Sequence, residues 1–103
     1  DEVYGADIMM EAYADYREPV SGPERLDTRV EQVDLTFLLF VRNGLPEPQS
    51  VEIRLQLVGL SSDAGTTVHL RVPARTEMLA TILRPISGAG SIRYGYSVSY
   101  AAD

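Results

Sequence analysis

The chain has 103 residues, of which 45% are hydrophobic and 23% are charged, and this composition is typical of one small globular domain spanning residues 1–103. A formal net charge of −6 argues against a nucleic-acid partner, because affinity for a phosphate backbone depends on a clustered positive surface. The sequence has no cysteine, which excludes disulfides, thiolate metal sites and a cysteine nucleophile, and no apolar run approaches the ~20 residues of a membrane span.

The first third of the chain is acidic. Residues 1–34 hold ten acidic residues and three arginines, a net charge of −7, whereas residues 35–103 hold five acidic residues and six arginines, a net charge of +1. Apolar residues in the segment 7–16 fit the spacing of a helix and also alternate as in a strand. We favour a strand there, with a helix as the alternative, and we expect residues 17–30 to form a long polar connection.

A strand is predicted next, over residues 33–42. Apolar residues occupy every second position, and the opposite face is also apolar at its centre, at Leu38 and Phe40. A strand that is apolar on both faces at its centre belongs inside a sheet and not at its edge. The pair Asn43-Gly44, which is followed by two prolines, is typical of a turn and predicts the end of this strand.

Four further strands are predicted at short spacing, over 51–57, 67–72, 78–83 and 91–100, with a loop over 59–67. The segments 51–57, 67–72 and 91–100 show period-two alternation, the apolar segment 78–83 is closed by Pro85, and turn residues separate the four. Such spacing favours an all-β fold and leaves no room for a βαβ crossover. The predicted fold is therefore an Ig-like antiparallel β-sandwich of six or seven strands.

The predicted core is made of the residues on the more apolar face of each strand. Each fully buried aliphatic side chain in this set is expected to contribute roughly 1.5–3 kcal/mol. The set is Ile8, Met10, Leu35, Phe37, Leu39, Val41, Val51, Ile53, Leu55, Leu57, Val68, Leu70, Val72, Leu83, Ile92, Tyr94, Tyr96 and Val98.

Residues with catalytic or metal-binding chemistry are sparse. His69 is the one histidine, and it lies at a polar position of a strand, so we expect it to be exposed and without a catalytic role. Acidic residues near the N-terminus are expected to form a solvated face, and the methionines to pack in the core. The weaker alternatives are a calcium site and a copper site, formed respectively by Asp7, Glu11 and Asp15 and by Met9, Met10 and Met78. We predict no enzyme activity, no bound metal and no cofactor.

The last predicted strand carries the best candidate for a ligand-binding surface. Tyr94, Tyr96 and Tyr100 lie on one face, and aromatic side chains in such a row can stack on sugars. Ile92 and Val98 share this face, whereas the opposite face is polar. The more apolar face is expected to turn inward, with the phenol groups reaching the rim of the core for hydrogen bonds. We therefore favour core packing for these tyrosines over ligand binding.

The sequence over residues 37–100 resembles a known family. "FVRN" ends a strand at Asn43 before a proline-bearing turn, "VPAR" makes a corner at 72–75, and the last strand alternates with Tyr94 and Tyr96. This order is similar to the small Ig-like domain that precedes the catalytic domain in some bacterial cell-wall endopeptidases of the lysostaphin type. The resemblance implies an accessory domain exported across the inner membrane. The zinc-binding H-x-x-x-D and H-x-H motifs of the peptidase are absent from this chain.

These observations lead to a functional hypothesis with one alternative. We expect a non-catalytic accessory or interaction domain of an exported bacterial protein, located in the periplasm or secreted. Its partner would be another protein, or another domain of the same protein, bound through a sheet edge or through the acidic N-terminal segment. The alternative is a carbohydrate-binding module that uses Tyr94, Tyr96 or Tyr100. The first residue, Asp1, suggests a processed chain or a domain of a longer one.

Overall fold

The computed structural model describes residues 16–88 and 90–103. This part of the chain contains eight strands and no helix. The strands are β1 (Arg17–Pro19), β2 (Leu26–Val33), β3 (Thr36–Asn43), β4 (Gln49–Val58), β5 (Leu60–Ser62), β6 (Thr67–Val72), β7 (Thr76–Pro85) and β8 (Arg93–Ala102).

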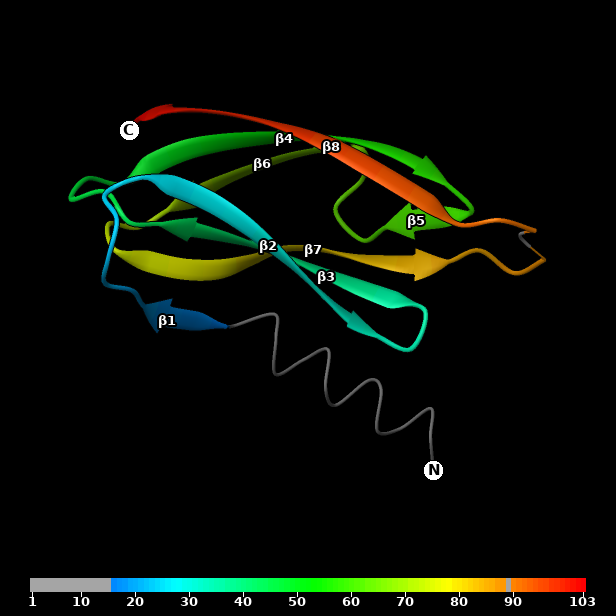
Figure 1. The fold of residues 1–103 in the computed structure, drawn as a ribbon. Helices are drawn as coiled ribbons and strands as arrows, with labels where there is room; N and C mark the ends of the chain where they lie inside the picture. The colour runs from blue at the N-terminus through cyan, green and yellow to red at the C-terminus, as the bar shows by residue number, and fades with distance from the viewer. Residues whose placement is uncertain (1–15, 89) are drawn as a thin grey trace.

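The strands form two antiparallel sheets packed face to face (Figure 1). One sheet has the order β1-β7-β3-β2, with β5 also paired to β7, and we call it sheet A. The other has the order β6-β4-β8, and we call it sheet B. The predicted antiparallel β-sandwich is confirmed. The described part alone holds eight strands. Six or seven were expected for the whole chain, because β1 and β5 are three-residue strands too short to show alternation and most of β2 lies in the segment predicted as a connection.

The prediction of a polar connection over residues 17–30 is wrong. β1 and most of β2 lie within it, which leaves a connection of only six residues between Pro19 and Leu26. β2 pairs with β3 along its whole length, and Leu26 and Val30 pack against the core. Its alternation was missed because Thr28 takes the inward position between these two aliphatic residues. β5 likewise lies within the segment predicted as a loop over 59–67.

The predicted strand over 33–42 is divided by a tight turn. Val33 ends β2 and pairs with Thr36 at the start of β3, so only Asp34 and Leu35 connect the two strands. Asp34 has φ 55°, a left-handed conformation that a short polar side chain tolerates. Leu35 was predicted to be in the core but lies in this turn with 56% of its surface exposed. Side chains alternate between the two faces only within a strand, so the inward direction predicted for Leu35 does not apply in the turn.

The core between the sheets contains most of the predicted residues. Its buried members from that prediction are Leu39, Val41, Val51, Ile53, Leu55, Val68, Val72 and Leu83. Six further predicted residues are half-buried against this cluster: Phe37, Leu57, Leu70, Ile92, Tyr96 and Val98. Tyr94 was also predicted to be in the core, but it is 37% exposed. Ile8 and Met10, and the choice between strand and helix for 7–16, lie outside the described residues.

Sheet A is buried on its outer face as well. Leu38, Phe40 and Ile82 form a second buried cluster there, separate from the core between the sheets. Tyr16 packs against it, with its ring centroid 5.2 Å from that of Phe40 in an edge-to-face arrangement. The prediction that this strand is apolar on both faces because it is central agrees with the position of β3 between β7 and β2.

Candidate functional site

The tyrosines of β8 lie on the face of sheet B that is turned toward sheet A. The antiparallel register places Tyr96 beside Leu55 and Tyr94 beside Leu57 on β4. The Tyr96 hydroxyl lies 2.8 Å from Thr28 Oγ1 on β2, so it is hydrogen-bonded across the two sheets. Tyr96 therefore closes the core beside β2, as expected for a tyrosine at the rim.

The other two tyrosines are more exposed. The Tyr94 ring lies 5.0 Å from the ring of Phe37, measured between centroids, and Tyr100 is 51% exposed. Tyr100 pairs with Val51 at the opposite end of β8. The three phenol rings thus belong to the rim of one packed interface, and they do not form a platform on an outer face of the sandwich.

β8 has a free edge. Within residues 16–88 and 90–103, it pairs with β4 and with no other strand. Two backbone hydrogen bonds show which β8 groups point to that edge. Leu55 donates its N–H to Thr66 on the β6 side, and Asp103 donates to Pro48, so the even-numbered residues of β4 face β8. Their partners on β8 are odd-numbered, as in the pair of Arg54 with Ser97.

It follows that the even-numbered residues of β8 direct their backbone groups away from β4. Tyr94, Tyr96, Val98 and Tyr100 each present an N–H and a C=O to the free edge, because backbone groups alternate in direction along an antiparallel strand. Such a row of donors and acceptors can pair with an added strand.

The free edges of the described part differ in how they are protected. β2 carries Asp27, Arg29 and Glu31, and β6 is six residues long and is followed by Pro73. Charged side chains, short length and proline each discourage pairing with another chain. β8 has ten residues in an uninterrupted register with β4 and, after Arg93, no charged residue or proline. It is therefore the edge best suited to accept a strand.

The outer face of sheet B is polar and slightly hollow. A concavity of about 580 Å³ is lined there by residues of all three strands, among them His69, Arg71 and Ser99. His69 is exposed, as predicted, and its Nε2 lies 3.6 Å from a carboxylate oxygen of Glu52. Arg54 donates to the other oxygen of Glu52 at 3.0 Å. Glu52 and Arg54 carry opposite charges, so the centre of this face has no strong net charge.

The metal-ligand alternatives are addressed only in part by the described residues. Met78 is 8% exposed and belongs to the core between the sheets. The remaining proposed calcium and copper ligands lie within residues 1–15, outside the description. In the part that is described, no group of three or more His, Asp or Glu side chains is placed to hold a metal ion.

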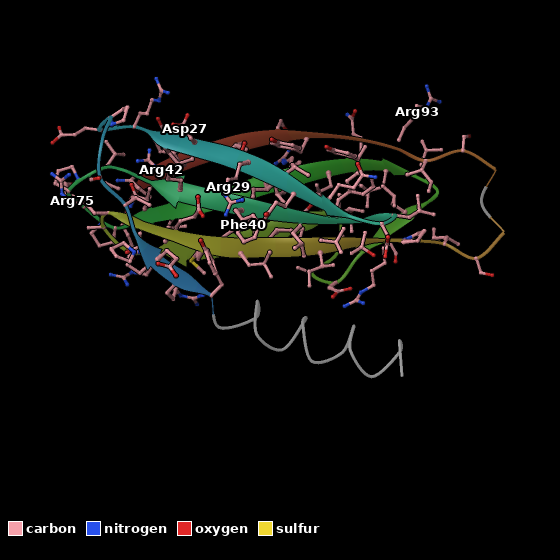
Figure 2. All side chains as sticks on the ribbon, turned by 60° about the horizontal axis from the view of Figure 1, so that its bottom comes forward. Asp27, Arg29, Phe40, Arg42, Arg75 and Arg93 are labelled. Atoms are coloured by element: carbon pink, nitrogen blue, oxygen red, sulfur yellow. The ribbon has the colours of Figure 1, made fainter. Side chains whose placement is uncertain are left out.

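A charged cluster that the sequence analysis missed lies on the outer face of sheet A. Glu77, 6% exposed on β7, accepts hydrogen bonds from Arg29 Nη2 at 2.8 Å, from Arg29 Nε and from the Tyr16 hydroxyl at 2.9 Å. The Arg29 guanidinium also lies 4.1 Å from the centroid of the Phe40 ring, a cation–π contact (Figure 2). No sequence signal links these residues, because they come from three strands and the segment before β1.

The hydrogen bonds of this cluster shift its ionisation. Those from Arg29 are the main reason that the pKa of Glu77 is lowered, against the opposing effect of burial. The pKa of Arg29 is raised, chiefly by the same hydrogen bonds. Burial, followed by the neighbouring Glu77, raises the pKa of Tyr16. The ion pair is therefore maintained at neutral pH.

Two loops at one end of the sandwich are joined by Asn43. Its side chain is fully buried, and its Nδ2 donates to the carbonyls of Glu47 at 2.9 Å, Val72 at 3.2 Å and Pro73 at 3.1 Å. Its Oδ1 accepts a hydrogen bond from the N–H of Leu45 at 3.0 Å. The strand-ending asparagine and the "VPAR" corner of the sequence are thus in direct contact.

Comparisons with protein-family models, with curated proteins and with solved structures find no significant match. None of the described residues belongs to a helix long and apolar enough to cross a membrane.

Proposed function

We propose that the chain is a non-catalytic interaction domain, an Ig-like sandwich of an exported bacterial protein, and that its partner adds a strand to the free edge of β8. The observation that carries this proposal is the uncharged, proline-free run from Tyr94 to Ala102 with its outward backbone groups. The resemblance to accessory domains of cell-wall endopeptidases supports the exported location, which fractionation of the native bacterium would test.

Peptide selection followed by hydrogen exchange tests the proposed edge. Peptides selected from a random phage-displayed library should bind as extended strands and slow the exchange of the Tyr94, Tyr96, Val98 and Tyr100 amides, at protein concentrations where the chain is monomeric. The Gly95 and Ser97 amides, which already face β4, should change little. Peptide binding that leaves the exchange of these four outward amides unchanged would contradict the proposal.

A matched pair of variants separates the backbone from the side chain. Tyr100→Pro removes one outward N–H without removing a bond to β4, whereas Tyr100→Ala removes the same ring and keeps the N–H. Tyr100→Pro should weaken peptide binding at least about tenfold relative to Tyr100→Ala, which corresponds to one hydrogen bond of ~1.4 kcal/mol. Equal affinities would exclude strand addition at this position.

The carbohydrate-binding alternative has its own readout. Tyrosine fluorescence can be titrated with peptidoglycan fragments and common glycans, because Tyr94 and Tyr100 are exposed enough to respond. We expect no change. A saturable change that Tyr100→Ala abolishes would instead support the carbohydrate-binding module.

A further inference from the structure

We infer that the strand added to β8 is β8 of a second copy of this chain, in an antiparallel two-fold pairing centred on Val98. This inference rests on the proposed function, since it requires the β8 edge to be the binding surface. The two three-stranded B sheets would join into one continuous sheet of six strands.

The two-fold axis follows from the direction of the backbone groups. When a strand pairs with its own copy around Val98, Val98 faces Val98, Tyr96 faces Tyr100, and Tyr94 faces Ala102 of the other copy. All these residues point their N–H and C=O groups to the free edge, so each of these pairs can exchange hydrogen bonds. The pairing is also isologous, because both copies use the same surface.

The charges at the two ends of β8 select this centre. Arg93 begins the strand, and Figure 2 shows its side chain directed away from the sheets. Asp103 directly follows the strand and continues its register, because its N–H bonds to Pro48. With Val98 on the axis, Arg93 of each copy lies opposite Asp103 of the other, whose carboxylate also forms an ion pair with Arg71 on its own β6. With Ser97 on the axis instead, Arg93 would lie opposite the uncharged Ala101.

The side chains between these ends are compatible with self-association. A two-fold interface opposes each charge to its own kind wherever it lies near the axis, and the run from Tyr94 to Ala102 contains no charged residue. On the inward face, the cross-strand pair of Tyr96 with Tyr100 would cover the more exposed of the two rings. On the outer face, Ser97 would lie opposite Ser99, and both are small.

The absence of cysteine allows the register to be tested by crosslinking. Ser97 and Ser99 of opposite copies would form a non-hydrogen-bonded pair, with Cα atoms about 4.5 Å apart, within the range that a disulfide spans. A mixture of Ser97→Cys and Ser99→Cys chains should therefore yield the mixed disulfide dimer, and neither variant should crosslink efficiently with itself. Thr67→Cys on β6 is the control for random collision.

Sedimentation velocity from micromolar to millimolar concentration tests the association itself. The chain should show a monomer–dimer equilibrium. Arg93→Asp should raise its Kd about tenfold or more, and addition of Asp103→Arg to that variant should restore it, whereas Arg54→Asp on the centre of sheet B should have no effect. If Arg93→Asp weakened the dimer only by disturbing the fold, adding Asp103→Arg would not restore the Kd. Restoration therefore shows that residues 93 and 103 of opposite copies interact.

The outcomes distinguish this inference from the proposed function. A chain that remains monomeric over the whole range, with no mixed crosslink above the Thr67→Cys control, overturns the second-copy partner. If selected peptides still protect the outward amides of β8, the edge remains a binding surface for another protein. A dimer in which Ser97→Cys crosslinks with itself overturns the Val98 axis, and a dimer that leaves the outward β8 amides unprotected overturns the inference that the second copy binds this edge.

Discussion

Asn43 joins the turn after β3 to the end of β6 and to the corner that follows it. The carbonyls of Glu47, Val72 and Pro73 all lie within hydrogen-bond distance of one side-chain amide. The position is fully buried, so water cannot replace the amide when it is removed. This single residue therefore fixes how the turn after β3 meets the corner after β6.

Replacement of Asn43 should be costly even when its shape is kept. Asn43→Ala should lower the free energy of unfolding by about 2–3 kcal/mol in a urea titration, because a buried acceptor left unpaired costs about 1–3 kcal/mol. Asn43→Asp keeps the acceptor for Leu45 but places a carboxylate beside three carbonyls, so it should be no more stable than Asn43→Ala at neutral pH. A near-native Asn43→Asp would show that the donor function is unimportant.

Glu77 makes the stability of the molecule depend on pH in a defined direction. Hydrogen bonds from Arg29 lower the pKa of Glu77 in the folded state. Ionisation of Glu77 is therefore more favourable in the folded chain than in the unfolded chain, and the charged form stabilises the fold. The resulting stability is fully present above the ordinary carboxyl pKa of about 4.3 and is lost as the pH falls through the lower, folded-state value.

Glu77→Gln tests this effect. At pH 7 the variant should be less stable than the parent by about 1–3 kcal/mol, because it loses hydrogen bonds to a charged group. The difference should shrink as the pH is lowered below about 4, where the parent also loses its negative charge. Urea titrations of both chains between pH 3 and pH 7 would measure it, with Glu24→Gln, an exposed carboxyl, as the control. A difference independent of pH would exclude the ion pair as its source.

At the level of the strands, β3 and β4 differ in how many faces they bury. Successive residues Leu39 and Phe40 of β3 are both fully buried, one between the sheets and one on the outer face of sheet A. In β4, Ile53 is fully buried while its neighbour Arg54 is exposed. One face of β4 is therefore exposed to solvent. Both faces of β3 are covered, because sheet A has a buried cluster on each side.

Alanine substitutions should reproduce this difference. Leu39→Ala and Phe40→Ala should each destabilise the fold by about 3–5 kcal/mol, and Ile53→Ala by about 2–5 kcal/mol, through lost burial and residual cavities. Arg54→Ala should change the stability by no more than about 0.5 kcal/mol. Denaturant midpoints at constant m-value would report these effects. A mild effect of Phe40→Ala would show that the outer cluster contributes little.

Strand alternation explains which elements were predictable. β4, β6 and β8 place an aliphatic or aromatic side chain on the inward face at nearly every second position, so their pattern is visible without the fold. β2 fills one inward position with Thr28, whose hydroxyl is hydrogen-bonded to Tyr96 of the other sheet. The turn at Asp34 carries no glycine, and apolar residues on both sides of it continued the pattern of a single strand.

For the candidate site, only the face on which its side chains lie was predictable from the sequence. Alternation placed Tyr94, Tyr96 and Tyr100 on one face, and the inward direction of that face agrees with the contact of Tyr96 with β2. Whether β8 is an edge strand, and which of its amides face outward, depends on its register with β4. That register pairs segments about forty residues apart, for which no local rule exists.

The whole molecule is held together by pairings between distant segments. β3 pairs with β7 and β4 with β8, so the central pairs of both sheets require long loops to close before they form. The core between the sheets contains residues from both, including Leu39 of sheet A and Ile53 of sheet B. Neither sheet can bury its inner face without the other, and unfolding should therefore be a single cooperative event.

Native-state hydrogen exchange can test this cooperativity under conditions in which the chain is monomeric. Ile53→Ala on β4 should reduce the protection of the slowest amides of β3 and β7 by the same free energy as that of the slowest amides of β4, because all of them exchange through global unfolding. Leu39→Ala should give the converse result from sheet A. If the amides of β3 kept their full protection in Ile53→Ala, sheet A would be stable by itself, and a shared core would not be what joins the two layers.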